Sequence, residues 1–442
     1  MLLRQVVEPL WATGWVAALT ISMPSIYHCQ REVSIRDMES NEAVGQRIAK
    51  AREFLGLTQA VVAEKLGLAR TTQVAIEQGR RPVSVAELYR YAEVLSRPVD
   101  YFLGLGVWGK ADFRPHFRLM ADKLDAMAIG PPRRPGRPRG APEASPEKLL
   151  LMNFEALCRN YLELEELNGL PRTAMPELPV PRLYSAPEAE QLAATVRAHL
   201  DLGLDAPIRD LRVRLEDTFA LRVYVLSQRG RLSAAAFHHP AIGGSVLLAE
   251  RSVPRMRFTL VRALGHLLAS RDEVMVDVQD VHKKSPAETF AAAFAYALLM
   301  PARGLRERFS SMHSEANEVN DVSLLFLART FGVTLKALRA RLESLKLSTP
   351  ATLRRVDETI KETRSEAAGE VDASDLPDQP RWEMLPERYV FLAMRAYRKE
   401  LVSKGRLAEC LCTTENDTAL RLLRYVASVT ELPQEDEVTR SS

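Results

Sequence analysis

The sequence predicts a mainly α-helical protein with a smaller α+β part. Three observations support this fold class. Hydrophobic residues make up 46% of the 442 residues and charged residues 26%, as in a globular chain rich in Leu, Ala and Arg. Strand-favouring runs are few, the best being Leu221–Ser227 and Gly244–Ala249. Breaks in composition divide the chain, and its length is enough for roughly two to four domains.

The main break is Pro131–Pro142, where prolines remove backbone donors and arginines repel one another. A shorter break follows at Pro176–Pro181, and an acidic run covers Ser365–Pro380. These breaks predict seven segments: a disordered or loosely packed extension (1–40), a helical head (41–104), a basic Pro/Arg-rich linker (105–145), a helix with its connector (146–182), a mixed domain (183–348), an acidic linker (349–381) and a helical tail (382–442).

Charge is unevenly distributed, although the whole chain carries only +3. Between Asn41 and Gly140 there are 17 Lys and Arg against 10 Asp and Glu. An excess of positive charge in one part of a chain favours a polyanionic partner.

The cysteines and the N-terminus indicate the compartment. The four cysteines show neither metal-ligand spacing nor a disulfide framework, which fits a reducing cytoplasm. Leu10–Ile21 is apolar but too short and too interrupted to span a membrane. We therefore expect a cytoplasmic protein without a membrane partner, whose folded part begins near Met38 or Asn41.

The segment 41–104 has the pattern of five short helices. Apolar residues recur at helical spacing, Thr58 and Ser84 are suited to begin helices, and Gly67 and Gly79 are suited to end them. The predicted helices are Ala43–Leu55, Gln59–Leu66, Ala69–Gln78, Val85–Leu95 and Pro98–Leu103.

Two short helices joined by a turn at Gly67 form a helix-turn-helix unit, whose second helix enters the major groove of DNA. Leu57–Gln59, Ile76–Gly79 and Pro98–Leu103 closely resemble the Cro/C1-type (Xre) family. The resemblance implies a five-helix lambda-repressor-like head. It also implies double-stranded DNA as a partner and a homodimer, because such proteins bind two-fold operators.

The resemblance assigns two sets of DNA-contacting residues. Side chains at the start of the recognition helix would reach base edges, where Arg and Gln read guanine and adenine. A second set would contact phosphates. The first set is Arg70, Thr71, Thr72 and Gln73, and the second is Gln59, Arg47, Arg80 and Arg81. For each arginine the alternative is a solvated surface charge.

The linker contains a segment similar to an AT-hook, whose Gly-Arg-Pro core lies in the minor groove of A·T-rich DNA. Pro135 stands where that motif has Arg, and the alternative is a flexible, soluble linker. The residues placed for the minor groove are Arg134, Gly136, Arg137, Pro138 and Arg139.

After the linker, Pro146–Asn168 is predicted to be a helix, and Pro254–Ser270 a second one. The stretch Arg257–His266 (RFTLVRALGH) has the frame of a zinc-peptidase helix, in which two histidines four residues apart bind a metal and a glutamate activates water. The first histidine and the glutamate are replaced by Arg262 and Ala263.

The order of motifs around this helix resembles the ImmA/IrrE metallopeptidase family over Leu211–Leu347. A strand comes before Arg-Phe-Thr and Gly-His, and Glu288 begins a segment that ends in Leu-Leu-Met-Pro. The resemblance implies a gluzincin-like fold in which His266 and Glu288 match two of three metal ligands. Arg262 has no lone pair for a metal and Ala263 cannot accept a proton. We expect no bound zinc, no other cofactor and no catalytic residue.

We predict that the guanidinium of Arg262 binds Glu288 in place of a metal–carboxylate link. The alternative is that Arg262 points to solvent and His266 is an ordinary helix histidine. His238 and His239 are adjacent on a strand, so at most one of them could face the site. Asp272, Glu273 and Asp277 are predicted to lie in a solvated loop.

The sequence therefore predicts a sequence-specific DNA-binding transcriptional regulator. Its peptidase-like domain has lost the zinc and catalytic residues and senses a small-molecule effector or a protein partner. Two alternatives stay open, an active zinc metallopeptidase that cleaves a repressor and an antitoxin-like autoregulator that binds a toxin. The residues do not identify the operator or the direction of regulation.

Overall fold

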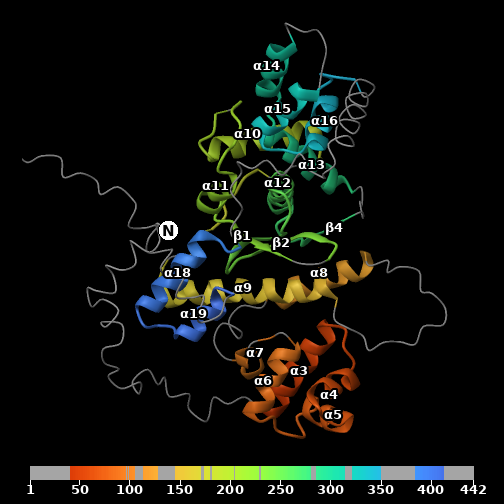
Figure 1. The fold of residues 1–442 in the computed structure, drawn as a ribbon, viewed down its shortest axis with the longest axis vertical. Helices are drawn as coiled ribbons and strands as arrows, with labels where there is room; N and C mark the ends of the chain where they lie inside the picture. The colour runs from red at the N-terminus through yellow and green to blue at the C-terminus, as the bar shows by residue number, and fades with distance from the viewer. Residues whose placement is uncertain are drawn as a thin grey trace, which may run out of the picture.

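The computed structural model describes residues 40–95, 97, 99–104, 113–127, 145–170, 174–179, 182–203, 205–227, 230–279, 285–313, 321–349 and 384–412. Over these residues the protein is mainly helical with one four-stranded mixed sheet, which confirms the predicted fold class. Figure 1 shows the sheet in the middle, with one group of helices above it and a long helix between it and the N-terminal head. None of the described helices is both long and apolar enough to cross a bilayer.

The head consists of five helices, as predicted. They are α3 (Asn41–Phe54), α4 (Gln59–Leu66), α5 (Arg70–Glu77), α6 (Val85–Leu95) and α7 (Val99–Leu103). Thr58 begins α4 by accepting a hydrogen bond from the Val61 N–H, and Gly67 ends it with a left-handed φ of 68°. The apolar faces of these helices form one cluster around Ile48, Ile76 and Tyr91.

The sheet contains β1 (Arg222–Leu226), β2 (Leu232–His239), β3 (Gly243–Ala249) and β4 (Met275–Val278), in the order β1-β3-β2-β4. The β1–β3 pair is parallel, and β2 is antiparallel to both β3 and β4. Because side chains alternate along a strand, each strand contributes to two apolar layers, one on each face of the sheet.

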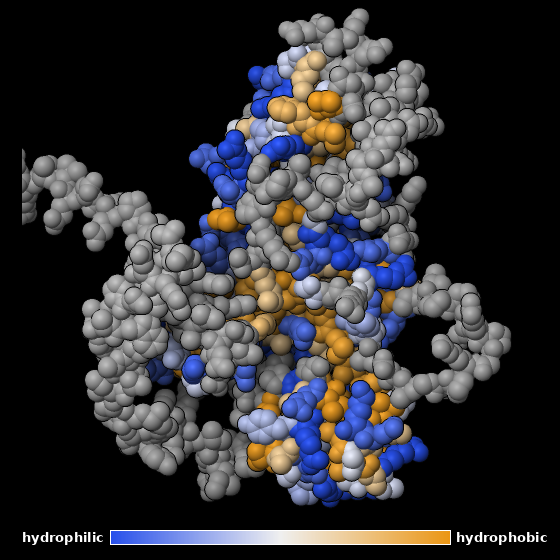
Figure 2. Space-filling model, in the orientation of Figure 1, coloured by the Kyte–Doolittle hydropathy of each residue, from blue (hydrophilic) through white to orange (hydrophobic). Residues whose placement is uncertain are grey.

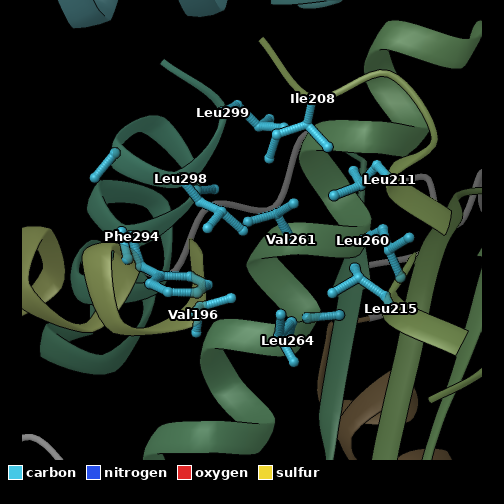
Figure 3. Packing of buried hydrophobic residues seen from close by; sticks show 14 of the residues in the cluster. Val196, Ile208, Leu211, Leu215, Leu260, Val261, Leu264, Phe294, Leu298 and Leu299 are labelled. Carbon is cyan, nitrogen blue, oxygen red and sulfur yellow. The ribbon is translucent and has the colours of Figure 1, made fainter. Parts of the chain in front are cut away.

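The helix α12 (Val253–Ala269) covers one face and packs against α13 (Pro286–Leu299). Figure 3 shows its side chains Leu260, Val261 and Leu264 among residues of the neighbouring helices. Gly265 allows this approach, since a Cβ there would lie 2.8 Å from Phe294 Cδ1. The same layer is completed by α10 (Ala186–His199), α11 (Leu211–Thr218), α14 (Ala302–His313), α15 (Asp321–Phe331) and α16 (Leu335–Ser344).

The other face is covered by α8 (Arg114–Met127), α9 (Pro146–Asn168) and two C-terminal helices, α18 (Glu387–Arg398) and α19 (Lys404–Cys410). The tail is fixed to α9, because Asn168 Nδ2 donates to the Leu392 carbonyl at 3.0 Å. The helix α9 lies between the sheet and the head (Figure 1). In Figure 2 hydrophobic residues extend from the head to the helices next to it, with hydrophilic residues on either side.

A buried ion cluster joins the head to α9. The carboxylate of Glu155 lies 2.7 Å from Arg97 of the head and 2.9 Å from Arg159 on α9 itself. The guanidinium of Arg97 also stacks 5.0 Å from the Tyr101 ring centroid. Burial of Glu155 opposes its ionisation, but the two arginines outweigh this effect and lower its pKa. Met152 of α9 belongs to the apolar core of the head, so head and body share both apolar and ionic contacts.

Candidate functional site

The tip of α5 presents polar side chains to solvent. The helix begins at Arg70, after the left-handed Gly67 has turned the chain away from α4. Arg70 and Thr71 are exposed, and Thr72 is half-buried. Three of the four predicted base-reading residues are therefore accessible to solvent. Their contact with DNA stays a prediction.

The fourth residue, Gln73, is fully buried, and the prediction that it reads a base is wrong for this structure. Its Nε2 donates to Glu77 Oε1 at 2.8 Å, and its Oε1 accepts from the Tyr91 hydroxyl at 2.5 Å. The reason is helical spacing, because Gln73 shares a face with Ile76 and Glu77, which turn toward the core.

Glu77 is the centre of a polar network that fixes α5 to α3 and α4. Arg52 Nε donates to Oε1 at 2.6 Å, and Gln59 Nε2 donates to Oε2 at 2.8 Å. Gln59 thus has an internal partner, and a phosphate contact through its second N–H stays a prediction. Burial opposes ionisation of Glu77, but the hydrogen bonds outweigh it and lower its pKa below 4.5. The network therefore stabilises the head above about pH 4.5, and this stabilisation is lost as the pH falls through the lowered pKa.

We expect Gln73→Ala to lower the free energy of unfolding by about 2–4 kcal/mol, because it leaves the buried Tyr91 hydroxyl without its acceptor and opens a cavity. Urea unfolding monitored by circular dichroism measures this change. Thr71→Ala on the exposed side of the same helix should stay within about 0.5 kcal/mol of the parent. Similar midpoints for the two variants would contradict the internal role of Gln73.

The predicted phosphate-contacting arginines differ in their surroundings. Arg47 is half-buried, and its Nη1 donates to the Phe102 carbonyl at 3.1 Å, which fixes α7 to α3. Arg81 forms an ion pair with Glu87 at 2.9 Å while 41% of its side chain stays exposed. Arg80 is exposed. Arg80 and Arg81 follow α5 and stay candidates for phosphate contact.

The five residues of the AT-hook-like segment lie outside the described residues, so their role stays a prediction. They are Arg134, Gly136, Arg137, Pro138 and Arg139.

The metal-site positions lie on α12 and α13. Ala263 is fully buried in the core, whereas Arg262 and His266 stand one turn apart on the partly exposed side. His266 Nε2 lies 3.2 Å from Glu288 Oε1, and Arg262 Nη1 lies 3.9 Å from Glu288 Oε2. Burial of Glu288 opposes ionisation, but His266 and Arg262 outweigh it and lower its pKa.

The closest partner of Arg262 is Asp277 rather than Glu288, because its Nη2 contacts Asp277 Oδ2 directly. The predicted Arg262–Glu288 link is therefore only a longer contact. The sequence predicted that Asp277 lies in a solvated loop, and this prediction is wrong. Asp277 lies in β4, with 18% of its side chain exposed. Only four residues form this strand, and they follow an exposed turn, so their sequence gives a weak strand signal.

The two strand histidines do not complete the site. His239 lies against Phe113 on the opposite face of the sheet, with ring centroids 4.8 Å apart, and its Nδ1 accepts from the Ala241 N–H. His238 is half-buried, and burial lowers its pKa. Its neighbours among charged groups are Arg271, Asp272 and His116.

The side chains at this site do not fit a zinc ion. Two protein ligands, His266 and Glu288, are close enough to share a metal, but structural and catalytic zinc sites use at least three. Arg262 occupies the position of the missing ligand and carries a permanent positive charge. In the part of the chain that the structure describes, no group of three or more His, Cys, Asp and Glu side chains is arranged to hold a metal.

Comparisons with known proteins agree with both resemblances. Residues 48–102 match a family described as helix-turn-helix, and residues 221–343 match one described as the IrrE N-terminal-like domain. The chain therefore contains an Xre-type helix-turn-helix domain and an IrrE/ImmA-like domain, as the sequence predicted.

One curated relative is an uncharacterized transcriptional regulator in the ATPase CF(0) region of Rhodospirillum rubrum. It is 37% identical over 59 residues, which are 13% of this chain and 55% of that protein. The chain thus matches about half the length of this relative. The crystal structure of ComR from Streptococcus suis aligns with 89% of this chain and 92% of its own, at 10% identity. Its TM-score of 0.15 is too low to carry an argument.

Proposed function

We propose that this protein is a sequence-specific DNA-binding transcriptional regulator. The observation that carries the proposal is the tip of α5, where Arg70 and Thr71 are exposed on a helix whose other side is fixed by the Glu77 network. A rigid helix with polar residues at its exposed start is what major-groove recognition requires. The name of the relative from Rhodospirillum rubrum, a transcriptional regulator, supports the same function.

The regulator acts as a homodimer on an operator with two-fold symmetry, because a single small recognition helix contacts only one half-site. The test of DNA binding is selection of bound sequences from a random duplex pool by the purified full-length protein. Recovery of a palindromic consensus supports both the function and the dimer. Retention of all sequences equally, at every salt concentration, would contradict sequence-specific regulation.

The IrrE-like body serves as a sensor or interaction module rather than as a peptidase. Ala263 cannot act as a general base, and the contact of Arg262 with Asp277 occupies the place of a metal ligand. The buried Arg97–Glu155–Arg159 cluster supports communication between the body and the head, because it fixes the head to α9 and α9 in turn packs on the sheet.

The second candidate function is an active zinc metallopeptidase, which is favoured by the proximity of His266 and Glu288 at 3.2 Å. We expect the purified protein to contain far less than one zinc per chain. We expect Arg262→His to bind about one zinc per chain, because this change supplies the third ligand. Elemental analysis after dialysis, first against zinc and then against buffer, measures the zinc content of the unaltered protein and of the variant.

Arg262→Gln is the matched control, since it removes the positive charge without adding a histidine ligand and should leave the zinc content low. Stoichiometric zinc in the unaltered protein would contradict the sensor proposal and favour the metallopeptidase. Absence of zinc from folded Arg262→His protein would contradict the view that Arg262 alone prevents metal binding.

A further inference from the structure

A cavity of about 590 Å³ lies beside Arg262, between α12, the ends of β3 and β4, and α16. Its volume is within the range of sites that hold a small molecule, roughly 300–1,000 Å³. Five strand residues contribute to its lining, namely Ser233, Leu248, Ala249, Asp277 and Val278. Of the metal-site positions Arg262 lines the cavity, whereas His266 and Glu288 do not.

The lining of this cavity is strongly positive. Four cationic residues line it, and Asp277 is the one acidic residue among the described lining residues. The four cations are Arg251, Arg255, Arg262 and Lys336. The direct contact between Asp277 and Arg262 neutralises that pair, and the other three cations outnumber the acidic residues of the described lining. Arg255 and Lys336 come from different helices and are both exposed.

Arg251 is held in place by neutral acceptors. Its Nη1 donates to the Glu250 carbonyl at 3.0 Å and its Nη2 to the Gly230 carbonyl at 3.5 Å. With the amide of Gln279 turned so that its oxygen faces Arg251, that oxygen accepts from Nη2 and Nε at 2.6 and 2.9 Å. Carbonyl and amide oxygens orient a guanidinium without cancelling its charge, so Arg251 keeps a fixed direction and a full positive charge.

The cavity also has an apolar side. Met256, Phe258 and Tyr296 line it, and the rings of Phe258 and Tyr296 lie with centroids 4.9 Å apart. Burial raises the pKa of Tyr296 although Arg262 opposes the shift, so its hydroxyl stays neutral at physiological pH. Cations on one side and an aromatic pair on the other match a ligand that combines a negative charge with an apolar group.

We propose that this cavity binds a small amphipathic anion, in which a carboxylate or phosphate group is attached to an apolar or aromatic body. The interpretation of the cavity as an effector site rests on the proposed regulatory function. Contacts connect the cavity to the head, since Lys123 of α8 donates to the carbonyl of Val274, the residue before β4, at 2.6 Å. The helix α8 packs on α9, which holds the head.

The test is calorimetric titration of the full-length protein with 3-phenylpropionate, phenyl phosphate, inorganic phosphate and the neutral 3-phenylpropionamide. We expect at least one anion to bind about tenfold or more tighter than the amide, because a charge-assisted hydrogen bond is added. The preferred anion identifies the headgroup, and the preference should fall as salt rises. Equal binding of anions and amide would overturn the proposal. So would the absence of any anion binding, or inorganic phosphate alone binding as tightly as phenyl phosphate.

Three variants assign the binding to this cavity. Arg255→Gln with Lys336→Gln removes two exposed charges and should reduce the anion preference to about threefold or less. Ala292→Trp fills the cavity from the half-exposed side of α13 and should abolish binding of the anions and the amide. Arg306→Gln, an exposed charge on α14 outside the cavity, should change nothing. Unchanged preference in the double variant would contradict the proposal, and thermal unfolding checks that each variant is folded.

This titration contains no DNA, so its result is separate from that of operator selection. Operator binding without anion preference overturns the ligand site and leaves the regulatory function standing. Anion preference without operator binding supports the cavity and overturns the regulatory function. If both are present, the anion should change the affinity for the operator, and the double variant should lose that change.

Discussion

Replacing Arg70 with alanine is expected to weaken binding to the selected operator by about 10- to 100-fold, the loss of one bidentate contact with a base edge. The reason is positional, because Arg70 is exposed at the first residue of α5, whereas Gln73 one turn later is buried. Fluorescence anisotropy with labelled operator measures the change. The loss of affinity should be largest for the consensus sequence and small for unrelated duplex DNA. The reason is that contacts with bases determine which sequence is bound, whereas contacts with phosphates only position the protein on the DNA.

The control for this experiment is Arg398→Ala, which removes the same charge from the exposed end of α18 in the body. It should leave operator affinity within about twofold, because its charge is screened over a Debye length of about 10 Å. Gln73→Ala cannot serve as a test of base reading, since it acts on the core. Equal losses of operator affinity in Arg70→Ala and Arg398→Ala would contradict base recognition by α5.

Replacing Glu155 with glutamine is expected to lower the free energy of unfolding by about 3–5 kcal/mol, because it leaves two buried guanidinium groups without their shared carboxylate. Arg97 and Arg159 have side chains only 4% and 2% exposed, so water cannot replace the lost partner. Urea unfolding followed by circular dichroism measures the loss. The same substitution should loosen the head, since Arg97 belongs to the head and Glu155 to α9.

Glu53→Gln is the matched control, because Glu53 carries the same charge on the head but is 66% exposed in its pair with Arg52. It should change the free energy of unfolding by less than about 1 kcal/mol. A similarly small effect of Glu155→Gln would contradict the view that the buried cluster holds head and body together.

Local patterns predicted most of the helices because their signals lie within a few residues. Thr58 and Gly67 mark the ends of α4 by capping, and the prediction for Pro146–Asn168 agrees with α9 to the residue. The short β4 was missed, because it offers four residues and owes its place to pairing with β2, a contact distant in sequence. The partner of Arg262 was missed for the same reason, since Asp277 comes to α12 only through that pairing.

The sequence by itself determined which chemistry each position offers. An arginine and an alanine in the frame RFTLVRALGH exclude a metal ligand and a general base there, whatever the fold does. The Xre-like and IrrE-like segments were also identified from residues alone, as the family comparisons agree.

Only the tertiary structure decided which of these groups face solvent and which face one another. Arg70 and Gln73 stand three residues apart with similar polar side chains, yet one is exposed and the other hydrogen-bonded to Tyr91 in the core. The exposure of a side chain and the identity of its hydrogen-bond partner depend on helices and strands that come from distant parts of the chain. Helical spacing places Gln73 on the face of Ile76 and Glu77, but it does not give the partner Tyr91, which comes from another helix.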